Sequence, residues 1–271
     1  SKELSHIGLV KNDAYLAPYE DAIRGRHEHA LWKMNQLTQN GKMTLSDFAN
    51  GYNYYGLHQT ADGWVFREWA PNATDIFLVG DFNGWSEQEA YQCHKIKGTG
   101  NWELTLPHDA LQHGQYYKMR VHWEGGEGER IPAWAQRVVQ DESSKIFSAQ
   151  VWAPAKPYVW KKKTFKPQTS PLLIYECHIG MAQDEEKVGS YNEFREKVLP
   201  RVVKDGYNAI QIMAIQEHPY YGSFGYHVSS FFAASSRFGT PEELKALIDE
   251  AHKNGIAVIM DIVHSHAVKN E

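Results

Sequence analysis

Hydrophobic and polar positions change their spacing twice along the 271-residue chain. Residues 1–49 have a helical texture, and Gly41 is a plausible end to the longest helical segment. The apolar residues of that segment recur at loose helical spacing: Ile23, Leu31, Met34 and Leu37. The pattern predicts an N-terminal helical arm that packs on a neighbouring part of the protein.

Residues 50–155 alternate between apolar and polar positions in short stretches such as "WVFREWA", "DIFLVGD" and "NWELTLP". Turn clusters rich in glycine, asparagine and proline separate these stretches, and no helix-length pattern interrupts them. Short alternating strands punctuated in this way are typical of an antiparallel β-sandwich. We therefore expect a sandwich domain over this range.

A connector and a third type of pattern follow the expected sandwich. Residues 156–171 are rich in proline and lysine and are interpreted as an inter-domain linker. In residues 172–271, apolar strands begin near positions 172, 208 and 256, with helical patterns between them. Their continuous apolar character predicts strands that are buried on both faces. The alternation of strands and helices predicts a parallel sheet with right-handed crossovers.

Both expected helices of this last region have recognisable start signals. Ser190–Glu193 is an S-x-x-E capping box, and Pro200 should kink the helix that follows or restart it. Thr240–Glu243 is a second capping box with proline in the first turn, and Gly255 should end that helix. Its expected buried stripe is Leu244, Leu247, Ile248 and Ala251.

Three strand units are too few to close an eight-stranded barrel, which takes about 250 residues. The region is therefore either a small open sheet or the first part of a barrel. The fold class that we predict is mixed: a helical arm, an antiparallel sandwich, and the beginning of a (β/α)8 barrel.

Composition excludes several classes of protein. The formal charge of −5 gives no basic footprint, so a nucleic-acid partner is not expected. No apolar run approaches the ~20 residues that cross a membrane, and residues 1–30 lack the apolar core of a signal peptide. Two cysteines, Cys93 and Cys177, are too few for a disulfide framework and lack metal-ligand spacing. A cytoplasmic location follows as the default expectation. All nine tryptophans precede residue 161, which suggests two domains with different tasks.

Two groups of residues are candidates for chemistry. Exposed indole rings can stack on the apolar faces of sugar rings, although tryptophan in an alternating strand more often belongs to the core. The candidates are Trp69, Trp85, Trp102 and Trp123, of which Trp85 lies in a turn. The second group is Asp261, His264 and His266, which follow an apolar strand at the position where α/β barrels place catalytic groups.

The alternatives for the second group remain open. Asp261 could bond loop backbone and align the edge of the sheet. His264 and His266 have the alternate spacing of a metal-binding pair, but no further carboxylate or lysine completes such a site. Glu176 and Glu217 also follow apolar strands, and a structural salt bridge is the expected role of each. We expect no metal and no cofactor.

Two long motifs resemble one known family. "FREWAPNATDIFLVGDFNGW" is similar to the carbohydrate-binding module of glycogen and starch branching enzymes. "IYECHIG" and the stretch from "LPRVVKDGYNAIQIM" to "DIVHSHA" resemble the start of the α-amylase-type barrel of 1,4-α-glucan branching enzymes of the eukaryotic-type subgroup. The resemblance covers the chain from about residue 17 to its end. It implies a glucan polymer, such as glycogen, starch or a maltooligosaccharide, as the partner.

The resemblance also implies roles for individual residues. Asp261 and His266 match residues that hold the sugar next to the scissile bond, and Tyr226 matches a tyrosine that stacks on that sugar. In the sandwich, the positions that match glucan contacts are Trp69, Trp85, Trp102 and Lys118. Asp261 and His266 are five residues apart, so both can face one pocket only if the strand ends near Val263 and the chain turns.

The family's nucleophile and acid/base follow the fourth and fifth barrel strands, and this chain stops after the third. The sequence therefore predicts an N-terminal fragment without those catalytic residues, inactive by itself. The parent enzyme would cleave an α-1,4 bond and transfer the segment to a 6-hydroxyl group. An incomplete barrel should expose apolar surface and favour self-association. The alternatives are another α-amylase-type hydrolase or debranching enzyme, and a non-catalytic glycogen-binding protein.

Overall fold

The computed structural model describes residues 8–168 and 171–269. The chain forms two compact units, residues 1–54 and 55–271. Three predicted segments extend beyond the described residues: positions 1–7 of the arm, 169–170 of the linker and 270–271 of the barrel region. Within the described ranges, no helix is both long enough and apolar enough to span a membrane.

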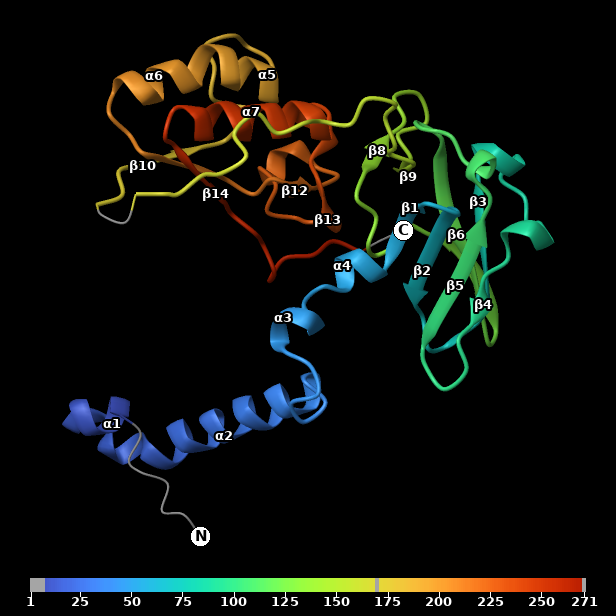
Figure 1. The fold of residues 1–271 in the computed structure, drawn as a ribbon, viewed down its shortest axis with the longest axis horizontal. Helices are drawn as coiled ribbons and strands as arrows, with labels where there is room; N and C mark the ends of the chain where they lie inside the picture. The colour runs from blue at the N-terminus through green and yellow to red at the C-terminus, as the bar shows by residue number, and fades with distance from the viewer. Residues whose placement is uncertain (1–7, 169–170, 270–271) are drawn as a thin grey trace. The chain divides into compact units, whose positions relative to one another are not determined.

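The first unit is helical, as predicted (Figure 1). It contains α1 (Gly8–Asn12), a 3₁₀ helix (Ala14–Tyr19), α2 (Glu20–Leu37), α3 (Leu45–Phe48) and α4 (Gly51–Tyr54). α2 ends four residues before Gly41, because Gln39 and Asn40 already adopt positive φ angles of 51° and 59°. No residue of α2 is buried, so its apolar positions do not form a core within this unit.

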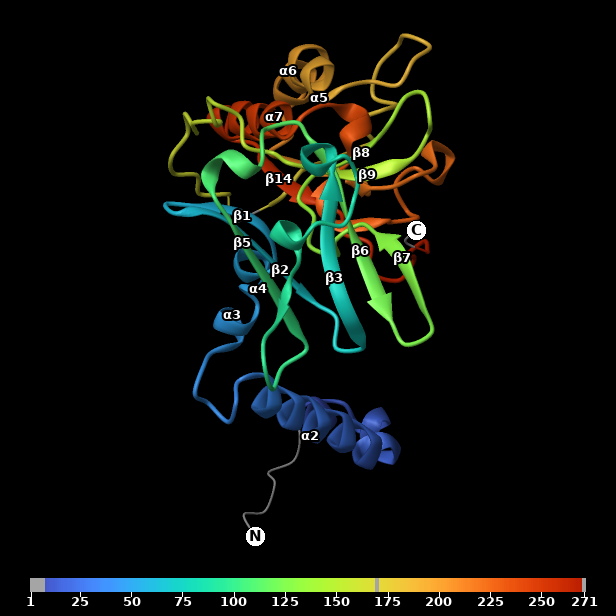
Figure 2. The same ribbon diagram turned by 90° about the vertical axis from the view of Figure 1, so that its right-hand side faces the viewer.

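The sandwich consists of two antiparallel sheets (Figure 2). One has the order β1-β2-β5-β4, with β1 Gly56–Thr60, β2 Gly63–Trp69, β5 Asn101–Leu106 and β4 His94–Lys95. The other has the order β3-β6-β9-β8, with β7 also paired to β6. Its strands are β3 Ala73–Gly80, β6 Tyr116–Trp123, β9 Phe147–Gln150, β8 Val138–Gln140 and β7 Gly126–Arg130. The predicted antiparallel architecture is confirmed.

Alternation along the strands builds one core between the two sheets. Phe66, Ile76 and Leu78 are fully buried in it, because every second residue of their strands faces inward. Trp64 and Trp102 also belong to this core. Ala233, from a hairpin of the barrel region, is part of the same cluster. The sandwich core is therefore completed by a residue from outside the sandwich.

The barrel region contains the predicted parallel sheet, in the order β10-β11-β14. β10 (Ile174–Cys177), β11 (Ala209–Ile212) and β14 (Ala257–Met260) start within two residues of the predicted positions. A separate hairpin pairs β12 (Gln216–Glu217) with β13 (Ser230–Ala234).

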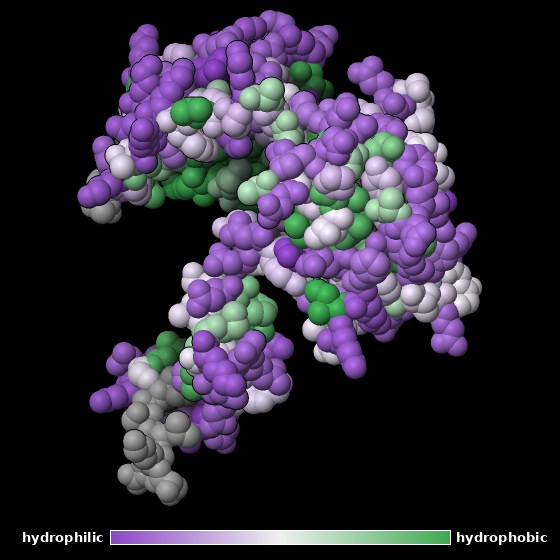
Figure 3. Space-filling view, turned by 45° about the vertical axis from the view of Figure 1, so that its right-hand side comes forward, coloured by the Kyte–Doolittle hydropathy of each residue, from purple (hydrophilic) through white to green (hydrophobic). Residues whose placement is uncertain are grey.

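The prediction that all three parallel strands are buried on both faces is wrong. Only β11 is largely buried, because it has a neighbour on each side. The outer strands expose Ile174 by 42% and Met260 by 41%. Figure 3 shows apolar side chains gathered on this side of the barrel region. The described part of the chain thus leaves an apolar sheet surface in contact with solvent.

The helices of the barrel region follow their predicted signals. The Ser190 box starts α5 (Tyr191–Glu193), which passes through a π-helical turn (Phe194–Val198) into α6 (Leu199–Lys204). Pro200 has no N–H to bond the carbonyl four residues earlier, which accounts for the widened turn before it. The Thr240 box starts α7 (Pro241–Lys253), which buries Leu244, Leu247 and Ala251. Both boxes make their reciprocal hydrogen bonds.

The sandwich and the barrel region share one compact unit through specific contacts. The rings of Trp134 and Phe232 stack with centroids 4.0 Å apart. The Arg137 guanidinium donates to the Gly239 carbonyl at 2.9 Å and lies over the Trp152 ring, 4.8 Å from its centroid. Hydrogen bonds also hold the predicted linker against α7. The Asp249 carboxylate of α7 accepts them from the Tyr158 hydroxyl and from the backbone N–H groups of Lys161 and Lys162.

Glu217 is a buried carboxyl group near this junction. Its side chain is 1% exposed and accepts a 2.7 Å bond from the Ser236 N–H. Burial raises its pKa to about 7, although the Ser236 bonds and the Arg137 charge favour the ionised form. The expected salt bridge does not form: Arg137 contributes a favourable field but no direct ion pair with Glu217 among the described contacts.

Replacing Glu217 with Gln should raise stability more at pH 8 than at pH 5. The folded pKa lies above the ordinary 4.5, so the contribution of the glutamate to stability falls as pH rises from about 4.5 to about 7. Gln keeps an acceptor for Ser236 and carries no charge. We expect a gain on the order of 2 kcal/mol at pH 8 relative to pH 5, measured by thermal unfolding. An equal effect at both pH values would contradict a buried, desolvated charge.

Candidate functional site

A cavity of about 380 Å³ opens on the outer face of the sandwich sheet that contains β6. It is lined by Asp81, Trp85, Tyr116, Lys118, Glu129, Asp141, Ser144, Ile146 and Ser148. Two of the four predicted sandwich contacts, Trp85 and Lys118, therefore share one cavity. Neither Trp69 nor Trp102 lines it.

The turn that carries Trp85 is held by a buried asparagine. The Asn83 Oδ1 atom accepts from the Gly80 N–H, and its Nδ2 donates to the Leu78 carbonyl, both at 3.0 Å. A Cβ at Gly80 would lie 2.4 Å from the Tyr116 carbonyl oxygen, so only glycine fits between the turn and β6. The motif "GDFNGW" thus fixes a tight corner at the end of β3.

Trp85 itself is half-buried and strictly oriented. Its backbone has φ of 60°, in the left-handed region that non-glycine residues seldom occupy. Its indole Nε1–H donates to Asp81 Oδ1 at 3.0 Å, and Asp81 Oδ2 accepts from the Tyr116 N–H at 2.7 Å. Asp81, which the sequence reasoning missed, therefore locks the indole to the edge of β6 and leaves a ring face on the cavity.

Two polar groups complete the cavity wall. Lys118 is only 8% exposed, and its Nζ lies 3.7 Å from Glu129 Oε2 on β7. Asp141 accepts bonds from the N–H groups and hydroxyls of Ser143 and Ser144 at 2.7–3.1 Å. The bond from the Ser144 N–H contributes most to lowering the pKa of Asp141 to about 2. The cavity thus combines an indole face with charged groups of both signs.

A histidine connects the Trp85 turn to the β6–β7 hairpin. His122 places Nε2 2.7 Å from Glu87 Oε1 and Nδ1 3.1 Å from Glu127 Oε2. The three side chains are close enough to hold a metal ion. Both ring nitrogens already lie within hydrogen-bond distance of a carboxylate, so each has a protein partner in this arrangement.

Trp69 and Trp102 lie on the other sheet. Trp69 is 60% exposed, and a Cβ at Gly100 would lie 2.7 Å from its Nε1, so the ring covers the "TGN" turn closely. Trp102 is 4% exposed and donates its indole N–H to the Ala70 carbonyl at 2.9 Å. The structure gives Trp102 the position of a core residue, and we do not retain it as a glucan contact.

At the edge of the parallel sheet, two predicted residues meet. The Tyr226 hydroxyl donates to Asp261 Oδ2 at 3.1 Å. The turn before Tyr226 needs Gly225, since a Cβ there would lie 1.9 Å from the Ala214 carbonyl oxygen. Ala214, Val228 and Val263 form a small buried cluster against which Tyr226 packs. The loops that follow β11 and β14 thus pack against each other.

The chain turns after β14 earlier than expected. β14 ends at Met260, three residues before Val263, and the Val263 N–H is bonded by the Gln216 side chain at 2.9 Å. The His266 carbonyl then accepts from the Val228 N–H at 3.0 Å. The side chains of His264 and His266 are exposed. The structure brings Tyr226 and Asp261 together, and it bonds the His266 backbone to the same loop.

Two family descriptions match separate parts of the chain. Residues 54–135 match "Carbohydrate-binding module 48 (Isoamylase N-terminal domain)", and residues 184–271 match "Alpha amylase, catalytic domain". The first match contains the Trp85 turn and Lys118, and the second contains Tyr226 and Asp261.

Known proteins match the chain over nearly its whole length. The 1,4-alpha-glucan-branching enzyme of Dictyostelium discoideum is 41% identical over 100% of this chain and 40% of its own length. That of Yarrowia lipolytica is 44% identical over 97% of the chain and 39% of its own length. The chain is a homologue of the 1,4-alpha-glucan-branching enzymes. It spans about two fifths of the length of these curated relatives.

Solved structures show the same fold at lower identity. A pullulanase from Paenibacillus barengoltzii covers 79% of this chain with a TM-score of 0.66 and 21% identity, and the chain covers 38% of that protein. The catalytic module of the pneumococcal glycogen-degrading protein SpuA gives a TM-score of 0.64 at 20% identity over the same 79% of this chain and 38% of its own. The arrangement of a sandwich followed by parallel β/α units is thus shared with these proteins.

Replacing Asn83 with Ala should destabilise the sandwich by about 1–3 kcal/mol, because the Gly80 N–H and the Leu78 carbonyl would lose their partners. Chemical denaturation would measure the loss. The Ser86→Ala variant, which removes an exposed donor to the same turn, is the control and should change stability by less than about 0.5 kcal/mol. Equal effects of the two changes would show that Asn83 does not organise the turn.

Proposed function

We propose that this chain binds α-1,4-glucan through the Trp85 cavity and contributes part of the active-site wall of a 1,4-α-glucan branching enzyme. The observation that carries the proposal is the joint placement of Trp85 and Lys118 in one cavity of a carbohydrate-binding module. The homology over the whole chain supports it.

The geometry suits a neutral polyhydroxylated chain. The indole of Trp85, fixed by Asp81, offers an apolar face on which a glucose ring can stack. Lys118 and Glu129 provide a donor and an acceptor for hydroxyl groups at the cavity wall. Trp69 supplies a second exposed ring on the opposite sheet, which a glucan chain can meet separately.

At the sheet edge, we propose that Tyr226 and Asp261 form one side of the sugar subsite next to the scissile bond. Their mutual hydrogen bond orients the tyrosine ring and holds one carboxylate oxygen in place. His266 would join them through the loop that its carbonyl group anchors to Val228. These groups bind and orient the sugar and do not attack it.

The reaction of the longer enzyme would cleave an α-1,4 bond and transfer the segment to a 6-hydroxyl group of glycogen or starch. A retaining reaction of this kind needs a nucleophile and an acid/base about 5–5.5 Å apart. For this chain alone we propose binding without transfer. New α-1,6 branch points formed from amylose by the pure 271-residue chain would contradict the proposal. Release of reducing ends without branch points by the longer protein would indicate a hydrolase instead.

A cytoplasmic location is part of the same proposal. Cys93 and Cys177 are both buried and unpaired, which agrees with a reducing compartment. Fractionation of the source cells would test it.

Replacing Trp85 with Ala should weaken binding of maltoheptaose at least about tenfold, because loss of ring stacking removes more than about 1.4 kcal/mol. Calorimetric titration of the chain measures the affinity. Trp123→Ala is the matched control: Trp123 is an exposed tryptophan at the end of β6, outside the cavity. Unchanged binding in Trp85→Ala would remove the main support for the proposed function.

Self-association through the open parallel sheet should appear in sedimentation velocity at high concentration. Ile174 and Met260 lie on its outer strands and are exposed, so replacing each with Lys should shift the chain toward monomer. Val159→Lys, which charges a 75% exposed residue of the linker, should leave the distribution unchanged. A single monomeric species of the unmodified chain would contradict the proposed association.

A further inference from the structure

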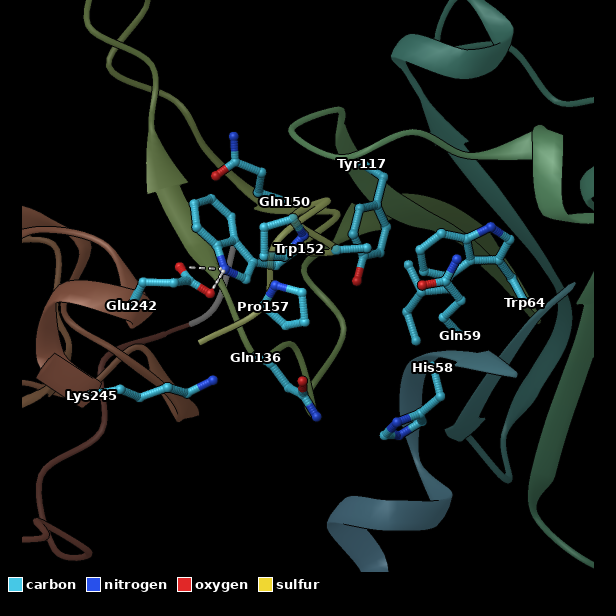
Figure 4. A pocket seen from close by; sticks show the side chains of 13 residues that line it. His58, Gln59, Trp64, Tyr117, Gln136, Gln150, Trp152, Pro157, Glu242 and Lys245 are labelled. Carbon is cyan, nitrogen blue, oxygen red and sulfur yellow. Dashed lines mark hydrogen bonds between the residues drawn. The ribbon is translucent and has the colours of Figure 1, made fainter. Parts of the chain in front are cut away.

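A second cavity, of about 330 Å³, lies between the sandwich and α7 (Figure 4). It shares no lining residue with the Trp85 cavity. The separation follows from strand geometry: Tyr116 and Lys118 point out of one face of β6 toward the Trp85 cavity, and Tyr117 points the other way. The two cavities therefore sit on opposite sides of the same strand.

The walls of the second cavity combine flat apolar surfaces with amide groups. Trp152 and Pro157 form one side, and Trp64 forms the other. Three glutamines contribute side chains: Gln59, Gln136 and Gln150. Small-molecule sites are commonly apolar clefts of about 300–1,000 Å³ with a few converging polar groups. This cavity meets that description at the small end of the range.

The Trp152 ring is held in place rather than loosely exposed. Its Nε1–H is shared between the two carboxylate oxygens of Glu242, at 3.1 and 3.0 Å, and the Arg137 guanidinium covers its ring. Gln150 is likewise fixed by donation to the Gly114 carbonyl at 3.0 Å. These contacts give the cavity a preformed shape that does not depend on a ligand.

Other polar groups of the cavity have no such partner. Tyr117 is 97% buried, since 3% of its surface is exposed, and its hydroxyl makes no hydrogen bond among the described residues. In Figure 4 this hydroxyl points into the space between Pro157 and Gln59. Burial raises the pKa of Tyr117, so the hydroxyl remains a donor at neutral pH. Gln136 and Lys245 also extend toward this space, with no bond to another described side chain.

The charge of the cavity favours a neutral ligand. Glu242 and Lys245 both come from α7 and have opposite signs, so their combined field selects neither anions nor cations. Amides, a phenol and an ammonium group can together donate to and accept from several hydroxyl groups at once. We propose that this cavity binds the end of an α-glucan, as a mono- or disaccharide unit, at a site separate from the Trp85 cavity. The identification of the sugar as glucan rests on the proposed function.

The test is a titration of the ¹⁵N-labelled chain with maltose, followed through the indole N–H signal of Trp152. The Trp152→Phe variant identifies that signal by its loss. We expect a saturable shift below about 50 mM maltose, the range of weak single-site sugar binding. The same shift should persist in Trp85→Ala, because the second cavity uses none of the residues of the first.

Two variants test the cavity itself. Gln136→Ala and Tyr117→Phe should each weaken maltose binding about fivefold, by removing one hydrogen-bonding group. Gln112→Ala, at an exposed glutamine outside the cavity, is the matched control and should bind as the unmodified chain does.

Each other outcome overturns a different statement. A Trp152 signal that does not move up to about 50 mM maltose, or that moves equally in Gln136→Ala, rules out the second site. Loss of the shift in Trp85→Ala shows a single site. A shift with glucose 6-phosphate but not with maltose shows that Lys245 selects an anion. Failure of Trp85→Ala to weaken maltoheptaose binding contradicts only the proposed function, because the Trp152 signal reports on the second cavity alone.

Discussion

The arrangement of the second compact unit, residues 55–271, depends on the contacts of the Arg137 guanidinium. Arg137 is nearly buried, and it directly precedes β8 of the sandwich. It bonds the Gly239 carbonyl directly before the cap of α7 and lies over the Trp152 ring. It also contributes a favourable charge to the buried Glu217. A buried cation needs partners on every side, so the residues around it are constrained together.

Much of the fold could be predicted from local signals. Both capping boxes and the alternating sandwich strands produced the expected elements, because these patterns report hydrogen bonds and faces within a few residues. The burial of the parallel strands could not be predicted in the same way. β10 and β14 have apolar sequences, but burial depends on neighbouring strands, and in the described part of the chain each has a partner strand on one side alone. The early end of α2 coincides with positive φ angles at Gln39 and Asn40; asparagine favours that region, but glutamine gives no such signal.

The candidate sites show the same division. The sequence suggests Trp85 as a sugar contact because a tryptophan in a turn has little reason to be in a core, and it suggests Tyr226 and Asp261 through their resemblance to family motifs; all three roles stay predictions. The sequence could not distinguish Trp69 from Trp102. Each lies within three residues of a turn, but Trp69 is 60% exposed and Trp102 is only 4% exposed. Asp81 was missed because its role joins a turn to a strand 35 residues away. Asp249 was missed because its partners belong to the connector, about 90 residues earlier.

One small residue has a consequence for how proteins with this fold can diversify. Ala233 lies in the β12–β13 hairpin of the barrel region, yet it completes the core of the sandwich. The sandwich is therefore not an independent domain that a flexible linker joins to the rest of the chain. Exchanging it for the corresponding module of another protein would place an unfamiliar surface against this hairpin and open a void or a clash there. Exchange of the sandwich between related proteins should preserve its core only when the β12–β13 hairpin is exchanged with it. The segment that must be inherited together is therefore longer than the sandwich itself.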